Sequence, residues 1–546
     1  MQKILSALAT LAGGVVVVVV LFNLADFDQP LTGEVLVEIN VPQDDTLTGA
    51  YTPGEQPYGV LLMAGFGSDQ TALRPLTSEF VKAGLHVFTF DFSGHGRSPG
   101  GLDFNNASTE RLANQVLAAE AKFRQLSGLT ADQIIFLGHS MGARVSLQAS
   151  TMMTTPPMLL LLLGTSVNLA PNQQAEIFTQ TQDSDLAWVQ ALGPENPNTD
   201  IILISGEWDD VLKPEGARLL VEKLSGTALE SQNRVVNVQT DPVRTLILVP
   251  KLLHNFEIYS IIPQLGITEA IGSADPSSQP NQYNQRVTDW LYGLGGLFLA
   301  LFAARGVINK QEANPPEAVI ESLGAYFRGK LLSWFPALIP GALIGLAVLF
   351  APMNSPAFNL HYIVFFGGYG LVLWWRYRRE KMPGVEGKMN FKGYASPTVK
   401  NTVLAGLVFL LVLGSISLMA RSGWWYAFPL NHRFLWLLLF TPVTAIGFRI
   451  GFKEADMLRD WHPDQFWLVW LNGLIGLLPF FLYPAILAAL GSTSGVLVGV
   501  QGLVVIALAM LTGSLIHKIS KRPWLAAMCQ AFLLYWMVLP LGALFR

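Results

Sequence analysis

The order of apolar and polar positions divides this chain of 546 residues into two halves with different patterns. In the first half, short apolar runs alternate with stretches of helical periodicity, which is typical of buried parallel strands separated by helices. In the second half, most apolar runs are about as long as a helix that crosses a bilayer. The sequence therefore predicts an α/β domain and an all-α transmembrane bundle, divided into residues 1–25 (N-terminal anchor), 26–272 (α/β domain), 273–286 (linker) and 287–546 (membrane domain of about eight helices).

The α/β domain is predicted to open with an antiparallel pair of strands, "GEVLVEINVP" and "TLTGAYTP". Further strands are expected at "YGVLLMAGFG", "LHVFTFDF", "QIIFLG", "MLLLLLGTS", "DIILISGEW" and "VRTLILVP", with helices at "LRPLTSEFVKAG" and "ERLANQVLAAEAKFRQL". This alternation predicts a mostly parallel sheet covered by helices on both faces. Residues 169–199, rich in Gln, Asn and Pro, fall between two strands and are a candidate lid.

Membrane-spanning helices are predicted in both halves of the chain. Residues 4–22 are apolar over about the length that crosses a bilayer. An uncleaved anchor is favoured over a signal peptide there, because the run is long and the following "NLADF" is a poor cleavage site. Eight further spans are predicted at approximately 288–304, 332–351, 359–375, 401–419, 434–450, 466–490, 494–515 and 524–544.

The basic residues between these spans predict their orientation, because cytoplasmic loops are enriched in Lys and Arg. If the N-terminus is cytoplasmic, the predicted inner loops hold seventeen Lys and Arg residues and the outer loops and tail hold three, Arg421, Arg433 and Arg546. The α/β domain and the residues after the last span are therefore expected outside the cytoplasm, in a multi-pass protein of the plasma membrane.

Composition separates the two halves further. Residues 26–286 carry a net charge of −15 and residues 287–546 one of +10, within a total of −4. Charged residues make up 14% of the chain, against about 25% in a typical soluble domain. No basic cluster is interleaved with aromatic residues, so a nucleic-acid partner is not expected. The single cysteine, Cys529, excludes an intramolecular disulfide.

A candidate nucleophile stands in the segment "GHSMG" (138–142), which fits the pattern G-x-S-x-G between a predicted strand and a helix. Such a turn presents a serine hydroxyl at the carboxyl edge of a sheet, and the flanking glycines avoid clashes within the turn. A hydroxyl needs a base, and the base needs an acid to orient it. Asp209 and His254 each follow a late predicted strand, so the candidate residues occur in the order Ser, Asp, His. Asp210 is the alternative acid.

Four segments in this order resemble the α/β-hydrolase superfamily, in its branch of lipases, esterases and serine peptidases. "AGFG" (Ala64–Gly67) resembles the oxyanion loop, although Ala64 stands where this family often has His. "DFSGHGRS" (Asp91–Ser98) resembles the turn that follows the next strand, and "GHSMG" is the elbow. "GEWD" together with "LLHNFE" resembles the acid and histidine segments. The resemblance covers about residues 33–272.

The resemblance implies a role for each residue. Ser140 attacks an acyl carbonyl, His254 takes and returns the proton, and Asp209 orients the imidazole. The backbone N–H groups of Phe66 and Met141 are expected to bind the oxyanion. His139, His95 and Arg97 are expected to be structural, and neither a metal nor another cofactor is expected, because no His, Asp and Cys cluster has ligand spacing. The glycines of "SGHGRSPGG" lack the Lys-Ser/Thr that a phosphate-binding loop would have.

The sequence thus predicts a membrane-bound serine hydrolase that cleaves acyl esters on the extracytoplasmic face. Its expected partners are a lipophilic acyl ester, including lipid-derived esters, and membrane lipid. A serine peptidase or amidase and an acyltransferase use the same triad and remain alternatives. A transporter or receptor with a non-catalytic outer domain is a further alternative, although the predicted span cores contain Asn472, Gln501 and Gln530 rather than charged groups.

Overall fold

The computed structural model describes residues 31–42, 44–103, 107–165, 167, 186–229, 234–238, 241–254, 257, 282–308, 318–389, 399–421, 429–462, 464–489 and 493–546. The described residues from 31 to 257 are called the sheet half below, and those from 282 to 546 the helical half. The predicted anchor (1–25), residues 169–185 of the candidate lid and residues 273–281 of the predicted linker lie outside the described residues.

The sheet half contains a nine-stranded sheet with the order β1-β2-β4-β3-β5-β6-β7-β9-β8. The six strands from β4 to β9 in this order pair in parallel, whereas β1, β2 and β8 pair antiparallel at the two edges. This arrangement confirms the predicted α/β fold with a mostly parallel sheet. The strands are β1 (Val35–Ile39), β2 (Leu47–Thr52), β3 (Gly59–Met63), β4 (His86–Phe90), β5 (Ile134–His139), β6 (Leu159–Leu163), β7 (Asp200–Gly206), β8 (Val235–Val238) and β9 (Arg244–Val249).

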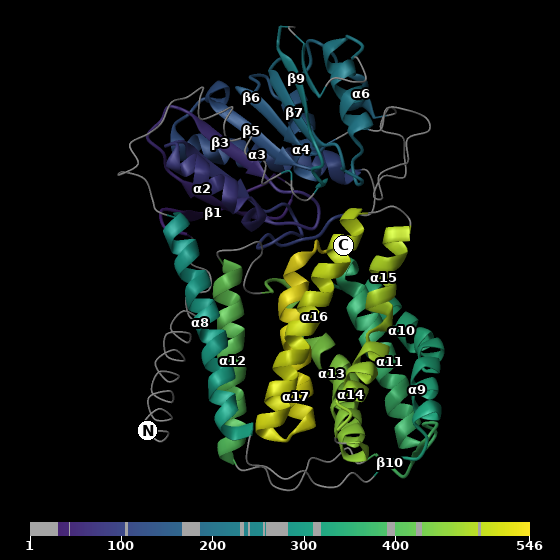
Figure 1. Cartoon of the computed structure of the whole chain (residues 1–546). Coiled ribbons are helices and arrows are strands. Elements are labelled where there is room, and N and C mark those ends of the chain that lie inside the picture. Colours follow the sequence, from purple (N-terminus) through teal and green to yellow (C-terminus); the bar gives the residue numbers. More distant parts are fainter. Residues whose placement is uncertain are drawn as a thin grey trace.

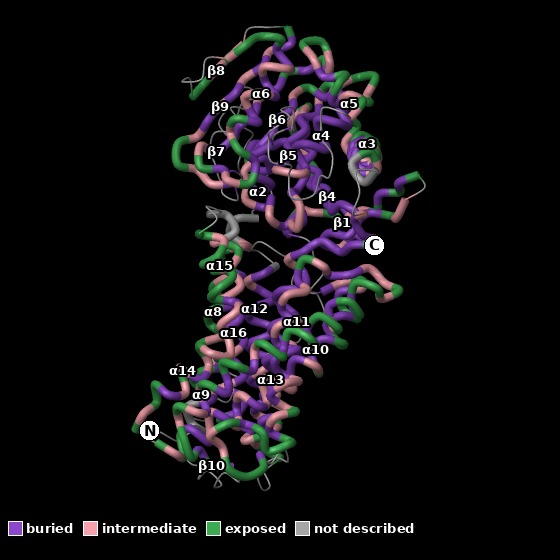
Figure 2. Tube along the Cα trace, turned by 90° about the vertical axis from the view of Figure 1, so that its right-hand side faces the viewer, coloured by how far each residue is buried: buried purple, intermediate pink, exposed green. Residues whose placement is uncertain are grey.

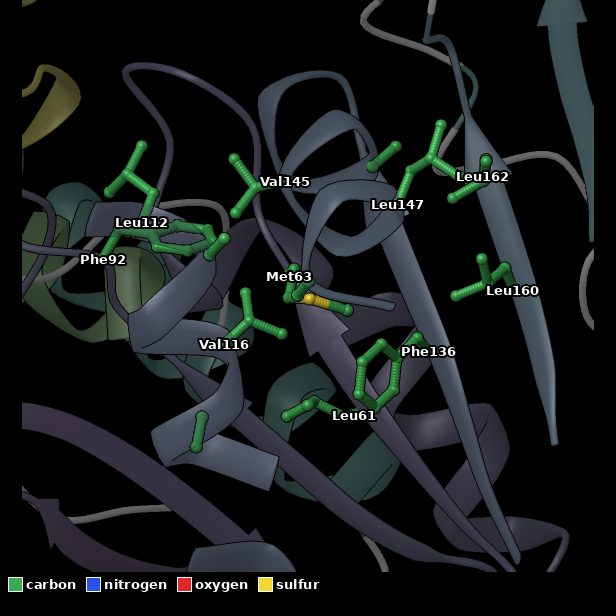
Figure 3. Close-up of a cluster of buried hydrophobic side chains, with 14 of the residues drawn as sticks. Leu61, Met63, Phe92, Leu112, Val116, Phe136, Val145, Leu147, Leu160 and Leu162 are labelled. Carbon is green, nitrogen blue, oxygen red and sulfur yellow. The ribbon is translucent and has the colours of Figure 1, made fainter. Parts of the chain in front are cut away.

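Helices cover both faces of this sheet, as the continuous apolar strands require. Side chains alternate along a strand, so Leu61 and Met63 of β3 point to one face and Val60 and Leu62 to the other. The first face packs against α3, α4 and α6, and Figure 3 shows part of this core around Met63. The second face packs against α2. These helices are α2 (Arg74–Lys82), α3 (Ala107–Ser127), α4 (Met141–Thr151) and α6 (Pro214–Ser225), with the short α5 (Ala187–Gln190), η1 (Gln70–Leu73) and η2 (Ala131–Gln133) between elements.

The helical half consists of long apolar helices. Among the described residues, seven helices are long and apolar enough to cross a membrane, and a bent pair would make eight. The elements are α8 (Gln282–Ile308), β10 (Val319–Ile320), α9 (Leu323–Leu332), α10 (Trp334–Leu349), η5 (Ala357–Asn359), α11 (Leu360–Arg378), β11 (Val385–Glu386), α12 (Val399–Arg421), α13 (His432–Trp461), α14 (Trp467–Gly476), α15 (Leu478–Ala489), α16 (Thr493–Ser520), α17 (Pro523–Val538) and η6 (Leu539–Leu541).

Several predicted spans differ from the helices observed; α13, for example, continues to Trp461, past the predicted end at residue 450. The stretch 466–490 is not one straight helix, because α14 and α15 meet at a bend of 64°. The span predicted at 332–351 begins earlier, since α9 and α10 together cover Leu323–Leu349. A span predicted from an apolar run shows neither a bend within the run nor helical residues before it. The bend between α14 and α15 and the residues of α9 could therefore not be predicted in this way.

A buried ion pair in the helical half was missed by the sequence prediction. Lys330, predicted in a loop, is buried in α9 and donates from Nζ to Glu454 Oε2 at 2.5 Å and to Asn472 Oδ1. Tyr377 donates to the other oxygen of Glu454, and Tyr326 donates to Asn472. Charged side chains rarely lie among apolar helices unless they are paired and hydrogen-bonded, and this pair has both kinds of partner.

The sheet half lies directly over one end of the helical half (Figure 1). Both ends of the helical half reach it. Near the start of α8, Gln285 Oε1 accepts from Thr32 Oγ1 at 2.7 Å, and at residue 546 the Arg546 side chain donates to Asp103 at 2.6 Å. The strand β10, which pairs with β11, lies at the opposite end of the helices, as both views show (Figures 1 and 2).

Candidate active site

The elbow at Ser140 joins β5 to α4 through a strained backbone. Ser140 has a φ of 54° and a ψ of −119°, which a residue other than glycine adopts only when its surroundings hold it there. Its N–H donates to Leu163 O at 2.8 Å, which ties the turn to the neighbouring strand. A Cβ at Gly142 would clash with Met63 O, and one at Gly138 would lie 2.5 Å from Ala143 N. Both glycines of the motif are therefore required by packing.

The structure brings Ser140, His254 and Asp209 together in one hydrogen-bonded chain. Ser140 Oγ lies 2.9 Å from His254 Nε2, and His254 Nδ1 lies 2.8 Å from Asp209 Oδ2. Asp209 is buried, and its other oxygen accepts from the N–H groups of Val211 at 2.9 Å and Leu212 at 2.8 Å. A carboxylate at Nδ1 keeps the proton on that nitrogen, so Nε2 can accept the hydroxyl proton of Ser140. Of the two adjacent candidates, Asp209 is the one hydrogen-bonded to His254.

The two predicted oxyanion donors lie in segments beside Ser140. The loop after β3 passes the elbow so closely that a Cβ on Gly65 would lie 3.0 Å from Ser140 Cβ, and Phe66 is the next residue. Met141 is the first residue of α4, where backbone N–H groups have no partner within the helix and favour negative charge. Their binding of an oxyanion remains a prediction.

Glu257, which the sequence analysis missed, is a second carboxyl group beside His254. It is buried, its Oε1 accepts the N–H of Gly206 at 2.6 Å, and its Oε2 lies 3.6 Å from His254 Nδ1. Burial, with the neighbouring Asp209 carboxylate, raises the pKa of Glu257 well above its ordinary value. This shift favours the protonated form of Glu257, which adds no second negative charge beside the imidazole. Its position three residues after His254 was the only signal in the sequence.

His139, predicted to pack in the elbow, also supports His254. The two rings have centroids 4.9 Å apart, and His139 Nε2 lies 3.1 Å from the carbonyl oxygen of His254, to which it donates. Burial and the nearby His254 lower the pKa of His139 to about 3, so the ring is neutral at physiological pH. This bond fixes the backbone that carries the candidate base.

His139, His254 and Glu257 also satisfy the distance criterion for a metal cluster, since their ligand atoms lie within 4.8 Å of one another. Their hydrogen bonds, however, already use the nitrogens that a metal would need. Both ring nitrogens of His254 are engaged, and Nε2 of His139 donates its proton to a carbonyl oxygen. The donor set therefore fits a hydrogen-bonded relay better than a metal site.

The glycine-rich turn after β4 makes room for another part of the chain. A Cβ at Gly94 would lie 2.7 Å from Leu544 O, and one at Gly101 would lie 2.9 Å from Arg546 N. Within the turn, Asp91 accepts the N–H of Arg97 at 2.9 Å, and His95 Nε2 accepts the N–H of Gly67 at 3.3 Å. The structure thus gives His95 and the backbone of Arg97 contacts of the structural kind that was predicted.

The sheet half is similar to known proteins. Residues 56–193 match the family model described as serine aminopeptidase, S33. Among solved structures, the esterase Pf2001 of Pyrococcus furiosus is 17% identical with a TM-score of 0.33, over 45% of this chain and 93% of the esterase. The monoacylglycerol lipase of Paleococcus ferrophilus is also 17% identical, with a TM-score of 0.31, over 41% of this chain and 98% of the lipase. No curated protein matches the chain.

The strand order and the match to the family model concern the same part of the chain. The matched residues include β3 to β6 and the whole elbow. The first half of the chain therefore has an α/β-hydrolase fold, and a helical region with several long apolar helices follows it.

Proposed function

We propose that the protein is a membrane-bound serine hydrolase that cleaves lipophilic acyl esters on the extracytoplasmic face of the membrane. The observation that carries this proposal is the hydrogen-bonded chain from Ser140 through His254 to Asp209, built on a strained strand-to-helix turn. Strain of this kind persists where the surroundings over-determine the backbone, as they do at many catalytic nucleophiles.

The first half of the reaction follows from this geometry. As Ser140 Oγ attacks the acyl carbonyl carbon, its proton passes to His254 Nε2, and the carbonyl π electrons move onto oxygen. The imidazolium is stabilised by the Asp209 carboxylate, whose Oδ2 lies 2.8 Å from His254 Nδ1. The oxyanion is bound by the N–H groups of Phe66 and Met141. When the intermediate collapses, the C–O bond to the alcohol breaks and His254 donates its proton to the leaving oxygen.

The second half repeats these steps with water. His254 Nε2 removes a proton from water, the hydroxyl attacks the acyl carbon, and Ser140 Oγ leaves as His254 returns the proton to it. The products are a carboxylic acid and free enzyme. An alcohol or amine in place of water would give acyl transfer by the same steps.

The serine nucleophile is tested with a fluorophosphonate probe, which phosphonylates an activated serine. Purified wild-type protein is expected to be labelled, whereas Ser140→Ala is expected to stay unlabelled. Heat-denatured wild-type protein serves as the control for non-specific labelling. Equal labelling of wild type and Ser140→Ala would refute the assignment of Ser140.

A serine peptidase or amidase is the second candidate, because the matched family model describes serine aminopeptidases. The same proton transfer from His254 would release an amine instead of an alcohol. Comparing p-nitrophenyl esters of increasing chain length with amino-acid p-nitroanilides separates the two candidates. Faster turnover of long-chain esters supports the proposed function, and faster turnover of the anilides supports the second candidate.

Three features support the membrane location and orientation. The chain has seven helices that could cross a bilayer, or eight with the bent pair, among its described residues. Eight crossings return the chain to the side where it entered, and both ends of the helical half contact the sheet half. The loops predicted to face the cytoplasm hold most of the basic residues, which favours the sheet half lying outside.

Cysteine labelling tests this orientation directly. Cys529 is buried, so new cysteines at the exposed Gln125 in the sheet half and Lys388 after β11 can be compared in the wild-type background. With a membrane-impermeant maleimide on intact cells or spheroplasts, Gln125→Cys is expected to react. Lys388→Cys is expected to react only after permeabilisation. The reverse pattern would contradict the proposed orientation.

Glu257 gives a prediction about stability and pH. Glu257→Gln keeps an acceptor for the N–H of Gly206, whereas Glu257→Ala leaves this buried N–H unpaired, at a cost of about 1–3 kcal/mol. Because the pKa of Glu257 is raised above 4.5 in the folded protein, the folded state binds more protons above this pH than the unfolded state. The contribution of Glu257 to stability therefore declines as pH rises from 4.5.

Thermal unfolding of the three proteins across a pH series checks this prediction. Glu257→Gln lacks the decline, so its stability relative to wild type is expected to increase as pH rises above 4.5. Glu257→Ala is expected to be less stable than Glu257→Gln at every pH. A constant difference in stability between wild type and Glu257→Gln would contradict the raised pKa of Glu257.

A further inference from the structure

Residues 542–546 of the helical half pair with the sheet half and with another segment of the helical half. On one side, Leu544 N donates to Gly94 O and Leu102 N to Leu544 O, each at 2.8 Å. On the other side, Phe545 and Ser355 exchange both backbone hydrogen bonds, at 2.8 and 2.6 Å. This segment therefore joins the glycine-rich turn of the sheet half to the loop before η5 in the helical half.

Arg433 of α13 makes a second connection at the same place. Its guanidinium is buried, and it donates to two carbonyl oxygens of the turn, Gly94 O at 2.6 Å and Gly96 O at 3.3 Å. It also donates to Leu539 O at 3.1 Å and Gly542 O at 2.6 Å in the helical half. A planar guanidinium with five donors can hold four carbonyl groups in this fixed geometry, whereas a lysine ammonium has three donors on a single atom.

His95 lies between the two glycines whose carbonyl groups Arg433 binds, and its side chain contacts the predicted oxyanion loop. Its Nδ1 lies 3.2 Å from Ser93 O. Because a carbonyl oxygen only accepts, Nδ1 carries the proton, and Nε2 is free to accept the N–H of Gly67 at 3.3 Å. Burial, with the charge of Arg433, lowers the pKa of His95 to about 4, so this acceptor persists at physiological pH.

The ring of Phe66 packs where the two halves meet, which is called the boundary below. Its centroid lies 5.9 Å from that of Phe358 in η5 and 6.0 Å from that of Phe545, and 6.3 Å from that of His95. Two of these three rings belong to the helical half. The side chain of Phe66, whose N–H is the predicted oxyanion donor, thus contacts the sheet half through His95 and the helical half through Phe358 and Phe545.

We propose that Arg433, Phe358 and Phe545 are positioning residues for the oxyanion donor at Phe66, so that the helical half completes the active site. This inference rests on the proposed hydrolase function. An oxyanion donor binds the transition state more tightly than the ground state, and losing one lowers kcat by about 10²–10³-fold. Loosening the loop from the helical half is therefore expected to lower kcat by about 10–100-fold and to leave KM nearly unchanged.

The test compares substitutions on the two sides of the boundary in the purified full-length chain. Arg433→Lys and Phe545→Ala weaken the boundary from the helical half, and Gly101→Ala pushes residues 545 and 546 away from the sheet half. Phe545→Leu is the conservative variant, expected to recover much of the lost kcat. Gly324→Ala in α9 is the control for Gly101→Ala, because this glycine is exposed and a Cβ there meets nothing within 4 Å.

Rates are expressed per active site, counted by fluorophosphonate labelling carried to completion, so that a partly unfolded preparation does not mimic a slower enzyme. A lower kcat per labelled site at constant KM, with partial recovery in Phe545→Leu, supports the inference. Wild-type kcat per site in Arg433→Lys, Phe545→Ala and Gly101→Ala overturns it while leaving the hydrolase proposal intact. Absence of hydrolysis dependent on Ser140 in the wild type overturns both.

Discussion

Replacing Ser140 with Ala is expected to lower kcat for ester hydrolysis by about 10⁶-fold, the loss seen when a catalytic serine is removed from an intact triad. The residual rate would come from oxyanion donors and substrate binding acting on water. Stability is expected to change little, because the backbone contact to Leu163 and the packing of Gly142 do not involve the hydroxyl.

The measurement is the steady-state hydrolysis of a short-chain p-nitrophenyl ester, compared among wild type, Ser140→Ala and Ser150→Ala. Ser150 is the control serine, since it is buried in α4, the helix that follows Ser140, and its hydroxyl donates to a backbone carbonyl, Leu147 O, at 2.7 Å. Ser150→Ala is expected to retain the wild-type rate. If Ser140→Ala kept more than a few per cent of that rate, another nucleophile would have to be responsible.

Replacing Asp209 with Asn is expected to lower kcat by about 10⁴-fold, whereas Asp210→Asn should have a rate close to wild type. The side-chain oxygen of the introduced asparagine can still accept from the N–H groups of Val211 and Leu212, so the local turn is preserved. Its amide group would then face His254 Nδ1 as a donor. The imidazole would place its proton on Nε2 instead, and Nε2 could no longer accept the proton of Ser140.

The same ester assay across a pH series checks the Asp209 prediction, with thermal unfolding as the control for stability. Asp209→Asn is expected to bind substrate with a KM near that of wild type, because the carboxylate acts on the imidazole and not on the ester. Loss of activity in Asp210→Asn with retention in Asp209→Asn would reverse the assignment. Equal losses in both variants would indicate that the loop, and not one carboxylate, is required.

The sheet and its elbow could be predicted because their signals are local. Strands such as β3 and β5 are buried on both faces and read as continuous apolar runs, and the elbow needs glycine at positions 138 and 142. The order of Ser140, Asp209 and His254 follows the order of the strands. Of the adjacent Asp209 and Asp210, the one to which the resemblance gives the role of the acid is hydrogen-bonded to His254.

Contacts between distant segments could not be predicted in this way. The pairing of Lys330 with Glu454, the pairing of residues 544–546 with the turn after β4, and the approach of Arg433 to Gly94 all join parts of the chain with no local pattern in common. The edge strand β8 and the helix α6 were also not predicted. They have 4 and 12 residues, which gives only a short pattern of apolar and polar positions.

The pairing of Leu102 with residues 544–546 also has a consequence for the order in which the protein folds during its synthesis. Asp103 and Arg546 are 443 residues apart in sequence, and the chain is synthesised from its N-terminus. The sheet can therefore assemble early, but the turn beside it lacks these partners until residues 544–546 have been synthesised. We expect a nascent chain arrested before residue 540 to contain a folded sheet and to be a poor catalyst, and one extended past residue 546 to gain activity.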